Sequence, residues 1–506
     1  MSSTLLPNTY SAPATIIASR PEKRRQRVWT RGIPPLLRPL IRAYLLGYAS
    51  AVAPKLLTLV IQHLTRKHKG NHAANGTKFK DEVSFQESAR RILVAGLDWR
   101  RFPTFCATMI GGSTLLEVPL NRLFSRVFLS VSELTRKRLS RWFASFISAW
   151  FSLRLLQSKQ SAAFTETVAV KANSPSGLKF ETVRYAGRTL DLSLFAATRA
   201  LDVVIGELWA RRRSRRTAAS KWSRVDEAIS QLTDPAVFAL SSAFIMWTWI
   251  YRPDKLPRAY NKWIASAASV DSRLIVALQR CRDGELQYGK DTGQAPLLQS
   301  MCADYKWPLE WGDPSKAIPF PCEMVHMGCG PSCEYHALSR FGRSFLWAMS
   351  TYLPLNLLLV ARRPSLKSTL RALLSASRSS AFLGAFIALF YYGVCLARAR
   401  LGPRLLGRGA AAAQRIDAGV CVGSGCTLCG WSVLLESASR RRELGLFVAP
   451  RALATRLPRR YGMEKQWRET LVYAVSTAVV FTCVLENKRR VRGVLGKVLG
   501  TVLEAS

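Results

Sequence analysis

The apolar stretch "SAFLGAFIALFYYGVCLA" at 380–397 constrains most strongly how this chain can fold. It places 18 uncharged residues between Arg378 and Arg398 (397 minus 380, plus one). A helix of this length rises about 27 Å, close to the thickness of the hydrocarbon layer of a bilayer. The stretch therefore predicts a membrane-spanning helix.

Several further runs have the same character and are bordered by charged residues: 235–251, 344–361, 418–435 and 470–485. Any one of them alone also fits a buried helix of a soluble protein. With the shorter runs included we count eight or more, most of them bordered by arginine or lysine, and this number favours the membrane. We therefore expect an all-α, polytopic helical membrane protein.

The charge of the chain leaves two partner classes to compare. Net charge is +42, pI is about 10.7, and 48% of the residues are hydrophobic. Such a balance suits a protein on anionic lipid or a binder of nucleic acid. Because of the apolar runs we expect membrane lipids and anionic headgroups as partners, with protein partners or self-association open and no specific nucleic acid. A soluble basic nucleic-acid-binding protein remains the alternative.

Three pairs of segments recur in the same order along the chain. "GYASAVAPKLLTLV" at 47–60 aligns with "WAMSTYLPLNLLLV" at 347–360, and "LFAATRAL" at 194–201 aligns with "LFVAPRAL" at 446–453. The third pair is "VFALSSA" at 237–243 and "VYAVSTA" at 472–478. The separations fall from 300 (347 minus 47) through 252 to 235, as longer loops in the first copy would cause. This order predicts an internal duplication.

The duplication divides the chain into five parts. We expect a basic polar tail at 1–35, a first helical repeat at 36–265, a polar linker at 266–336, a second repeat at 337–500 and a short tail at 501–506. The first 27 residues lack a basic start followed by a compact apolar core, so no secretory signal is expected.

Each repeat holds five expected helices, and two polar segments, 64–90 and 158–188, read as loops. The helices begin near Leu40, Phe102, Trp142, Leu190 and Pro235, and near Phe341, Ala381, Ala418, Leu444 and Thr470. The fourth of each carries the "LF" motif with Arg199 or Arg451, which suggests a place in the membrane interface or between other helices, where the arginines would snorkel. The number of crossings and their orientation stay open, because basic residues border most spans on both sides.

The linker ends in "PCEMVHMGCGPSCEYH", which gathers cysteine and histidine. Thiolate and imidazole groups are zinc ligands, so Cys322, His326, Cys333 and His336 form the expected metal set, with Cys329 beside them. Their spacing fits no common zinc finger. A disulfide or a packed turn at the membrane surface are the alternatives.

Two further features lie within or near the apolar runs. Small residues let helices approach closely, so Gly419, Gly423, Gly425 and Gly430 are expected to pack against a neighbouring helix. Glu117 is an acid close to membrane depth, where ionisable groups are often functional, although Pro119 suggests that its helix ends nearby. No phosphate loop, nucleophile elbow, dinucleotide fingerprint or zinc-protease motif is present, so we expect no enzymatic activity and no cofactor other than zinc.

The segment 322–360 resembles the transmembrane protein 135 family. The resemblance rests on Cys322, His326, Ser332, Cys333 and His336, followed by an apolar helix centred on "YLPL" at 352–355, and Cys329 is an addition to that pattern. Later stretches at 381–393, 416–432 and 472–486 are also similar to that family.

This family is distantly similar to mitochondrial import-channel subunits and to a small peroxisomal membrane protein. The resemblance implies a multi-pass protein of the peroxisomal or mitochondrial membrane, acting in lipid homeostasis or organelle dynamics. Together with the duplication, it suggests transport along a path between the halves, near Glu117 and the glycine-rich run. A zinc-dependent membrane scaffold centred on 322–336 is a further alternative.

Overall fold

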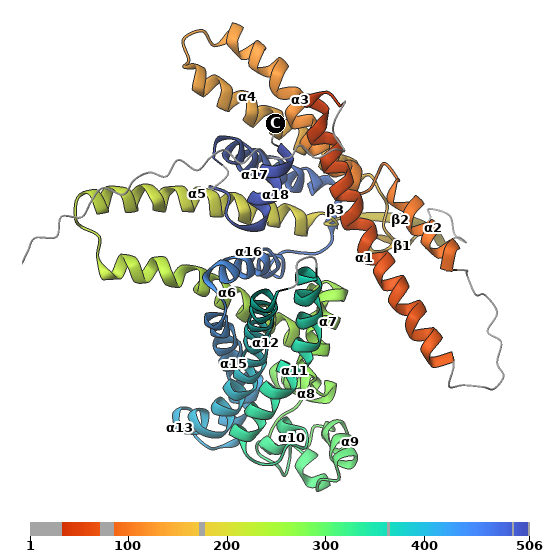
Figure 1. Ribbon diagram of the computed structural model, residues 1–506. Coiled ribbons are helices and arrows are strands. Elements are labelled where there is room, and N and C mark those ends of the chain that lie inside the picture. The colour runs from red at the N-terminus through yellow and green to blue at the C-terminus, as the bar shows by residue number, and fades with distance from the viewer. Residues whose placement is uncertain (1–32, 71–84, 172–177, 362–364, 488–489, 504–506) are drawn as a thin grey trace, which may run out of the picture.

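The computed structural model describes residues 33–70, 85–171, 178–361, 365–487 and 490–503. Helices make up most of these residues, and the strands among them form one small three-stranded sheet. Figure 1 shows two groups of helices, one above the other. The expectation of a predominantly α-helical chain is confirmed.

The first group combines helices from the first half with two from far along the chain. Neighbouring helices pack in the order α1, α3, α4, α17, α5, and α18 lies against α1, α16 and α17. These helices are α1 (Arg38–Gly70), α3 (Phe102–Val127), α4 (Glu133–Gln157), α5 (Leu190–Ala218), α17 (Gln466–Glu486) and α18 (Gly493–Leu503). A short helix, α2 (Phe85–Gly96), packs on α1.

The second group is built in a similar way. Its helices pack in the order α11, α12, α15, α6, α16. They are α11 (Cys333–Val360), α12 (Leu366–Cys395), α15 (Cys421–Cys429), α6 (Arg224–Tyr251) and α16 (Ala438–Ala454).

Each half contributes helices to the group of the other half. Helix α6 comes before the joining segment but packs on α15 and α16, whereas α17 comes late in the chain and packs on α4 and α5 (Figure 1). Helices α5 and α16 contact each other and hold the two groups together. They are the elements that carry the repeated "LF" motif.

Hydroxyl caps define where several helices begin. Ser132 caps α4, Ser332 caps α11, and Ser223 forms a capping box with Asp226 at the start of α6. Proline does not end α3, contrary to the sequence-based expectation. Pro119 lies inside that helix, which continues to Val127.

Five described helical segments are long and apolar enough to cross a membrane. They are Pro35–Val60, Arg224–Tyr251, Leu366–Leu405, Ala410–Leu435 and Met463–Glu486. The run 344–361, expected to be a span, forms the later part of α11, which is not among them. Five is fewer than the eight or more runs expected, because several helices, α5 and α16 among them, carry charges along their length. The chain therefore has the character of an integral membrane protein.

The segment 158–188 is not the loop that its composition suggests. Strands β1 (Thr165–Lys171) and β2 (Leu178–Ala186) form an antiparallel hairpin, and β2 also pairs with β3 (Tyr461–Gly462) from the second half. In the other expected loop, 64–90, helix α1 continues to Gly70 and α2 begins at Phe85. The centres of both, "NHAANG" and "ANSPSG", lie outside the described residues, as does the tail up to residue 32, and the expected tail at 501–506 begins inside α18.

The joining segment is folded and helical. It contains α8 (Ser272–Asp283), α9 (Ala295–Tyr305) and α10 (Cys322–His326), and α7 (Arg258–Ala268) precedes it. Leu274, Met301 and Met324 from this segment belong to the same buried core as Phe390 of α12. The segment 266–336 is therefore part of the second group rather than a loose polar linker.

Candidate functional sites: two matching clefts and a cysteine–histidine cluster

Each group of helices contains a large apolar cleft. The first cleft has a volume of about 410 Å³ and lies between α1, α3, α5, α17 and α18. The second cleft, of about 250 Å³, lies between α6, α7, α11, α12 and α16. Apolar and aromatic side chains line both, and Arg199 is the charged residue that borders the first. Ligand pockets have this apolar lining and range from about 300 to 1,000 Å³.

The two clefts are lined by corresponding positions of the two halves. On α5 and α16 the lining residues pair at a separation of 252 (444 minus 192): Leu192 with Leu444, Phe195 with Phe447 and Ala196 with Val448. On α6 and α17 they pair at 235 (473 minus 238): Phe238 with Tyr473, Ser242 with Thr477, Ile245 with Val480 and Met246 with Phe481. These are the separations that the repeated sequence segments show.

Two more helix pairs follow the same rule without an obvious sequence repeat. On α7 and α18, again at 235, the pairs are Tyr260 with Leu495, Trp263 with Val498, Ile264 with Leu499 and Ala267 with Val502. On α3 and α12, at 277 (382 minus 105), they are Phe105 with Phe382, Cys106 with Leu383, Met109 with Phe386 and Ile110 with Ile387. Fifteen of the 17 residues lining the second cleft thus have a counterpart in the first.

A third cavity lies between the two clefts, where α5 and α16 meet. This bridging cavity, of about 580 Å³, shares Leu192 and Phe195 with the first cleft and shares Tyr260 and Trp263 with the second. Arg451 also lines it. The three cavities therefore border one another from one group to the other.

The arginines of the repeated motif hold similar positions on their own helices. The guanidinium carbon of Arg199 lies 5.2 Å from the ring centroid of Phe195, and that of Arg451 lies 3.7 Å from that of Phe447. Arg199 is buried and forms an ion pair with Glu443 of α16 at 3.5 Å, and its burial lowers its pKa. This contact links α5 to α16.

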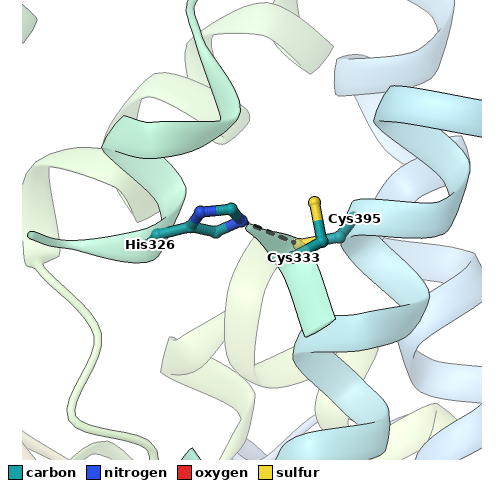
Figure 2. A group of neighbouring side chains, drawn as sticks. All are labelled: His326, Cys333 and Cys395. Atoms are coloured by element: carbon teal, nitrogen blue, oxygen red, sulfur yellow. Dashed lines mark hydrogen bonds between the residues drawn. The ribbon is translucent and has the colours of Figure 1, made fainter. Parts of the chain in front are cut away.

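The cysteine and histidine side chains converge at one end of the α11–α12 hairpin. His326 comes from α10, Cys333 is the first residue of α11 and Cys395 is the last of α12. Figure 2 shows these three side chains close together. Their ligand atoms all lie within 4.8 Å of one another. His326 and Cys395 are buried. Cysteine and histidine are the ligands that zinc prefers.

The ring of His326 is held in one orientation. Its Nδ1 lies 2.7 Å from the carbonyl oxygen of Gly330, and its Nε2 lies 3.4 Å from Sγ of Cys395. A carbonyl only accepts, so Nδ1 carries the proton and Nε2 keeps its lone pair toward the thiols. Burial lowers the pKa of His326, which favours this neutral ring.

The other expected ligands take different places. Cys322 begins α10, one turn before His326, and burial raises the pKa of its thiol. His336 is not in the three-residue set: its ring stacks on that of His326 with 4.6 Å between centroids, and burial lowers its pKa to about 3. Cys329 lies 3.9 Å from the Ser339 hydroxyl instead. All 11 cysteines are free thiols.

Sequence reasoning did not identify Cys395. Cys395 lies 62 residues beyond Cys333 (395 minus 333), inside the apolar run 380–397. A cysteine in such a run is usually interpreted as a small hydrophobic residue. The antiparallel contact of α11 with α12 brings the start of one helix beside the end of the other. This hairpin places Cys395 at the cluster. The two consecutive apolar runs, 344–361 and 380–397, are the sequence signal that could have suggested such a hairpin.

A buried ion pair lies just beyond this cluster and was also missed. Nε of Arg398 lies 2.6 Å from Oδ1 of Asp417, and the hydroxyl of Tyr288 donates to Oδ2 at 2.6 Å. The side chains of Arg398 and Asp417 are 1% and 0% exposed. Each lies in a short π-helical turn, Leu396–Leu401 and Ile416–Val420, a conformation often found at functional sites. The sequence shows these residues only as borders of two apolar runs.

The glycine-rich run contacts its neighbours at some of its positions. A Cβ on Gly425 would lie 2.6 Å from the carbonyl oxygen of Phe390, and one on Gly430 would lie 2.4 Å from Cα of Ala239. Gly419 faces Arg282 and Trp247, with the nearest atom 3.0 Å away, whereas Gly423 has only an ordinary contact at 3.7 Å. The close helix contacts are therefore at Gly425, which faces α12, and at Gly430, which faces α6.

Glu117 forms an ion pair within the first group. Its Oε1 accepts a hydrogen bond from Nε of Arg141 on α4 at 2.8 Å. Its helix, α3, is not among the five segments able to span a membrane, and Glu117 lines neither cleft nor the bridging cavity. The carboxylate thus links α3 to α4.

Comparisons with known proteins add no relative. The scan of protein-family models, the search of curated proteins and the search of solved structures each found no match.

Proposed function

We propose that this chain is a multi-pass membrane protein made of two related helical halves, and that it binds lipid acyl chains in the two clefts and passes them through the bridging cavity. It acts without catalysis, in the lipid homeostasis of an organelle membrane, peroxisomal or mitochondrial, or in the dynamics of that organelle. Transport between the halves then runs along the contact of α5 with α16.

The observation that carries this proposal is the correspondence of the two cleft linings. Two cavities produced by accident would not use matching positions on four pairs of helices. A duplicated unit that keeps its cleft in both copies explains this agreement. Because nearly all the lining atoms are apolar, the clefts suit hydrocarbon better than polar solutes.

The exposed surface supports a membrane location. Large apolar side chains are exposed on several helices, among them Leu45 at 54%, Leu358 at 70% and Leu359 at 78%. Within the span Pro35–Val60, only 17% of the most apolar stretch of 18 residues is buried inside the protein. Such surfaces are rare on soluble monomers, and lipid would cover them.

Photocrosslinking tests the binding step. Full-length protein reconstituted with a phosphatidylcholine that carries a diazirine in its acyl chain should form adducts on cleft peptides of both α6 and α17. Ala196→Trp fills the first cleft and Val448→Trp fills the second, so each should remove most adducts of its own cleft and leave the other unchanged. Leu201→Trp and Leu453→Trp are matched controls, because these side chains are 56% and 46% exposed. Equal labelling in all four variants would contradict the proposal.

A second variant separates transport from binding. Ala259 lines the bridging cavity but neither cleft, so Ala259→Trp should keep both sets of adducts. It should also slow the movement of a fluorescent phospholipid between the leaflets of proteoliposomes. Unchanged movement in Ala259→Trp, or none with the unaltered protein, would count against transport.

Carbonate extraction distinguishes the membrane protein from a soluble binder of nucleic acid. We expect the tagged protein to stay in the membrane pellet, and imaging should show it with peroxisomal or mitochondrial markers. Release by carbonate, together with salt-sensitive binding to nucleic acid, would favour the soluble alternative instead.

A further inference from the structure

We propose that His326, Cys333 and Cys395 bind a structural zinc ion, with Cys322 as the fourth ligand. The site goes beyond lipid binding, and it does not depend on it. It would fasten the joining segment to the end of the α11–α12 hairpin, since its ligands come from α10, α11 and α12.

The geometry is close to what zinc requires. With bonds of about 2.0 Å to nitrogen and about 2.3 Å to sulfur, tetrahedral zinc holds these ligand atoms about 3.5 Å apart. Nε2 of His326 and Sγ of Cys395 are 3.4 Å apart, and all three ligand atoms lie within 4.8 Å. Only small side-chain movements would bring them to a shared ion.

The surroundings of His326 already orient it as a ligand. Metal-binding histidines commonly donate the proton of their second nitrogen to a carbonyl, which fixes the tautomer and the ring. Gly330 provides this carbonyl at 2.7 Å, and the ring of His336 stacks on the face of His326. A histidine packed only for its shape would not need its free nitrogen directed at two thiols.

The ligand types favour zinc over other cations. Thiolate and imidazole are soft or intermediate ligands, whereas calcium and magnesium prefer oxygen, and no carboxylate belongs to the three-residue set. Cys322 completes four ligands because it begins α10 one turn before His326, and residues four apart lie on the same face of a helix. Closed sites of four such ligands are typical of structural zinc.

A disulfide between Cys333 and Cys395 is the competing use of these residues. It would consume both thiols and leave Nε2 of His326 without a partner in a buried position. Cys329 offers a control for both possibilities, because it lies in the same segment but outside the cluster.

Metal analysis of the full chain tests the site. Protein purified in detergent under reducing conditions from zinc-supplemented cells should contain about one zinc per chain. Cys333→Ser, Cys395→Ser, His326→Ala and Cys322→Ser should lose it, and Cys329→Ser should keep it. His326→Cys should also retain zinc because it offers another soft ligand, which separates loss of a ligand from loss of the fold. Cobalt substitution should give the absorption bands of tetrahedral thiolate coordination.

Several results would overturn the proposal. Unaltered protein without zinc when the ion is supplied would do so, as would zinc that persists in Cys333→Ser and Cys395→Ser, or a Cys333–Cys395 disulfide found by peptide mass. Zinc retained in Cys322→Ser alone would overturn the assignment of the fourth ligand.

Discussion

Arg398 and Asp417 place two opposite charges where almost no water reaches them. The pair is supported by Tyr288 and by the carbonyl of Phe320, which accepts from Nη2 of Arg398 at 3.0 Å. Removing one member of such a pair leaves the other charge buried and uncompensated, which is far worse than replacing both. The pair therefore makes the end of the hairpin sensitive to single substitutions.

We expect Asp417→Asn to lower the free energy of unfolding by about 3–5 kcal/mol. The double variant Arg398→Met with Asp417→Leu should recover most of that loss, because neither charge remains. Unfolding in detergent measures both. Glu334→Gln is the control, because its partner Arg400 and Glu334 itself are 51% and 52% exposed, and such pairs contribute less than about 1 kcal/mol. Equal losses in Asp417→Asn and Glu334→Gln would contradict the prediction.

Acid should weaken a second contact, in the first group. Lys159 donates to Oδ2 of Asp98 at 2.6 Å, and this hydrogen bond is the main cause that lowers the pKa of Asp98 to about 2. Because the folded pKa lies below the ordinary value of 3.8, the stabilisation is complete above about pH 4 and is lost as the pH falls through about 2.

Lys159→Met should move the pKa of Asp98 back toward its ordinary value. Stability profiles between pH 2 and pH 5 should then be flatter in the variant than in the unaltered chain. Lys290→Met, at an exposed lysine in the joining segment, is the control. Identical acid slopes in Lys159→Met and the unaltered chain would show that Lys159 does not hold Asp98.

For individual residues, the sequence predicted which side chains would belong to a site better than it predicted which side chains they would contact. His326 and Cys333 were recognised because they lie close together in the chain, whereas Cys395, Arg398 and Asp417 depend on how two helices fold back. Spacing along one segment is visible in a sequence, but contact between segments is not. Glu117 illustrates the same limit, since its partner Arg141 comes from the next helix.

Among the elements, α12 and α15 show how glycine decides helix spacing. A Cβ on Gly393 would lie 2.8 Å from Cα of Gly425, so the two backbones are in direct contact. Only small residues permit this approach.

Gly425→Ala should therefore push the helices apart and destabilise the protein by about 1–3 kcal/mol. Gly423→Ala, one half-turn away, meets its nearest atom at 3.7 Å and should be neutral within about 1 kcal/mol. Thermal unfolding of the two variants gives a direct comparison. A larger loss in Gly423→Ala would show that the contact at Gly425 is not the limiting one.

Most of the long helices were visible in the sequence, because apolar runs mark them. The failures have physical causes. The β-hairpin also pairs with residues far along the chain, since Tyr185 pairs with Gly462, 277 positions away (462 minus 185), and Pro119 is accommodated inside α3. The joining segment is polar on average, yet residues three or four positions apart in its short helices reach the core, as Leu274, Ala277 and Cys281 do in α8.

For the molecule as a whole, the exchange of α6 and α17 is the feature with the clearest consequence. Each group lacks helices unless both halves are present. A cut in the exposed turn after Asp291 should therefore give two fragments, 1–291 and 292–506, that accumulate only when expressed together. Co-purification of the two fragments measures this. Either fragment alone, recovered as a single well-behaved species, would contradict the exchange.

The sequence predicted the repeated order of segments but not this exchange. A repeated sequence segment indicates which two helices resemble each other. It does not show in which of the two groups each helix packs. The cleft linings show constant separations for α3 with α12 and for α7 with α18 as well, although these helices have no obvious repeated sequence.

The exchange also imposes an order on biosynthesis. Residues up to 218 leave the ribosome 248 residues before α17 begins (466 minus 218), an interval of about 10–50 s at ordinary translation rates. Throughout that interval the walls of the first cleft are incomplete, so the nascent helices must be shielded by lipid or by an insertion chaperone until the last elements arrive. A ribosome that stalls within the final third would thus release a chain whose earlier half is open and recognisable to quality control.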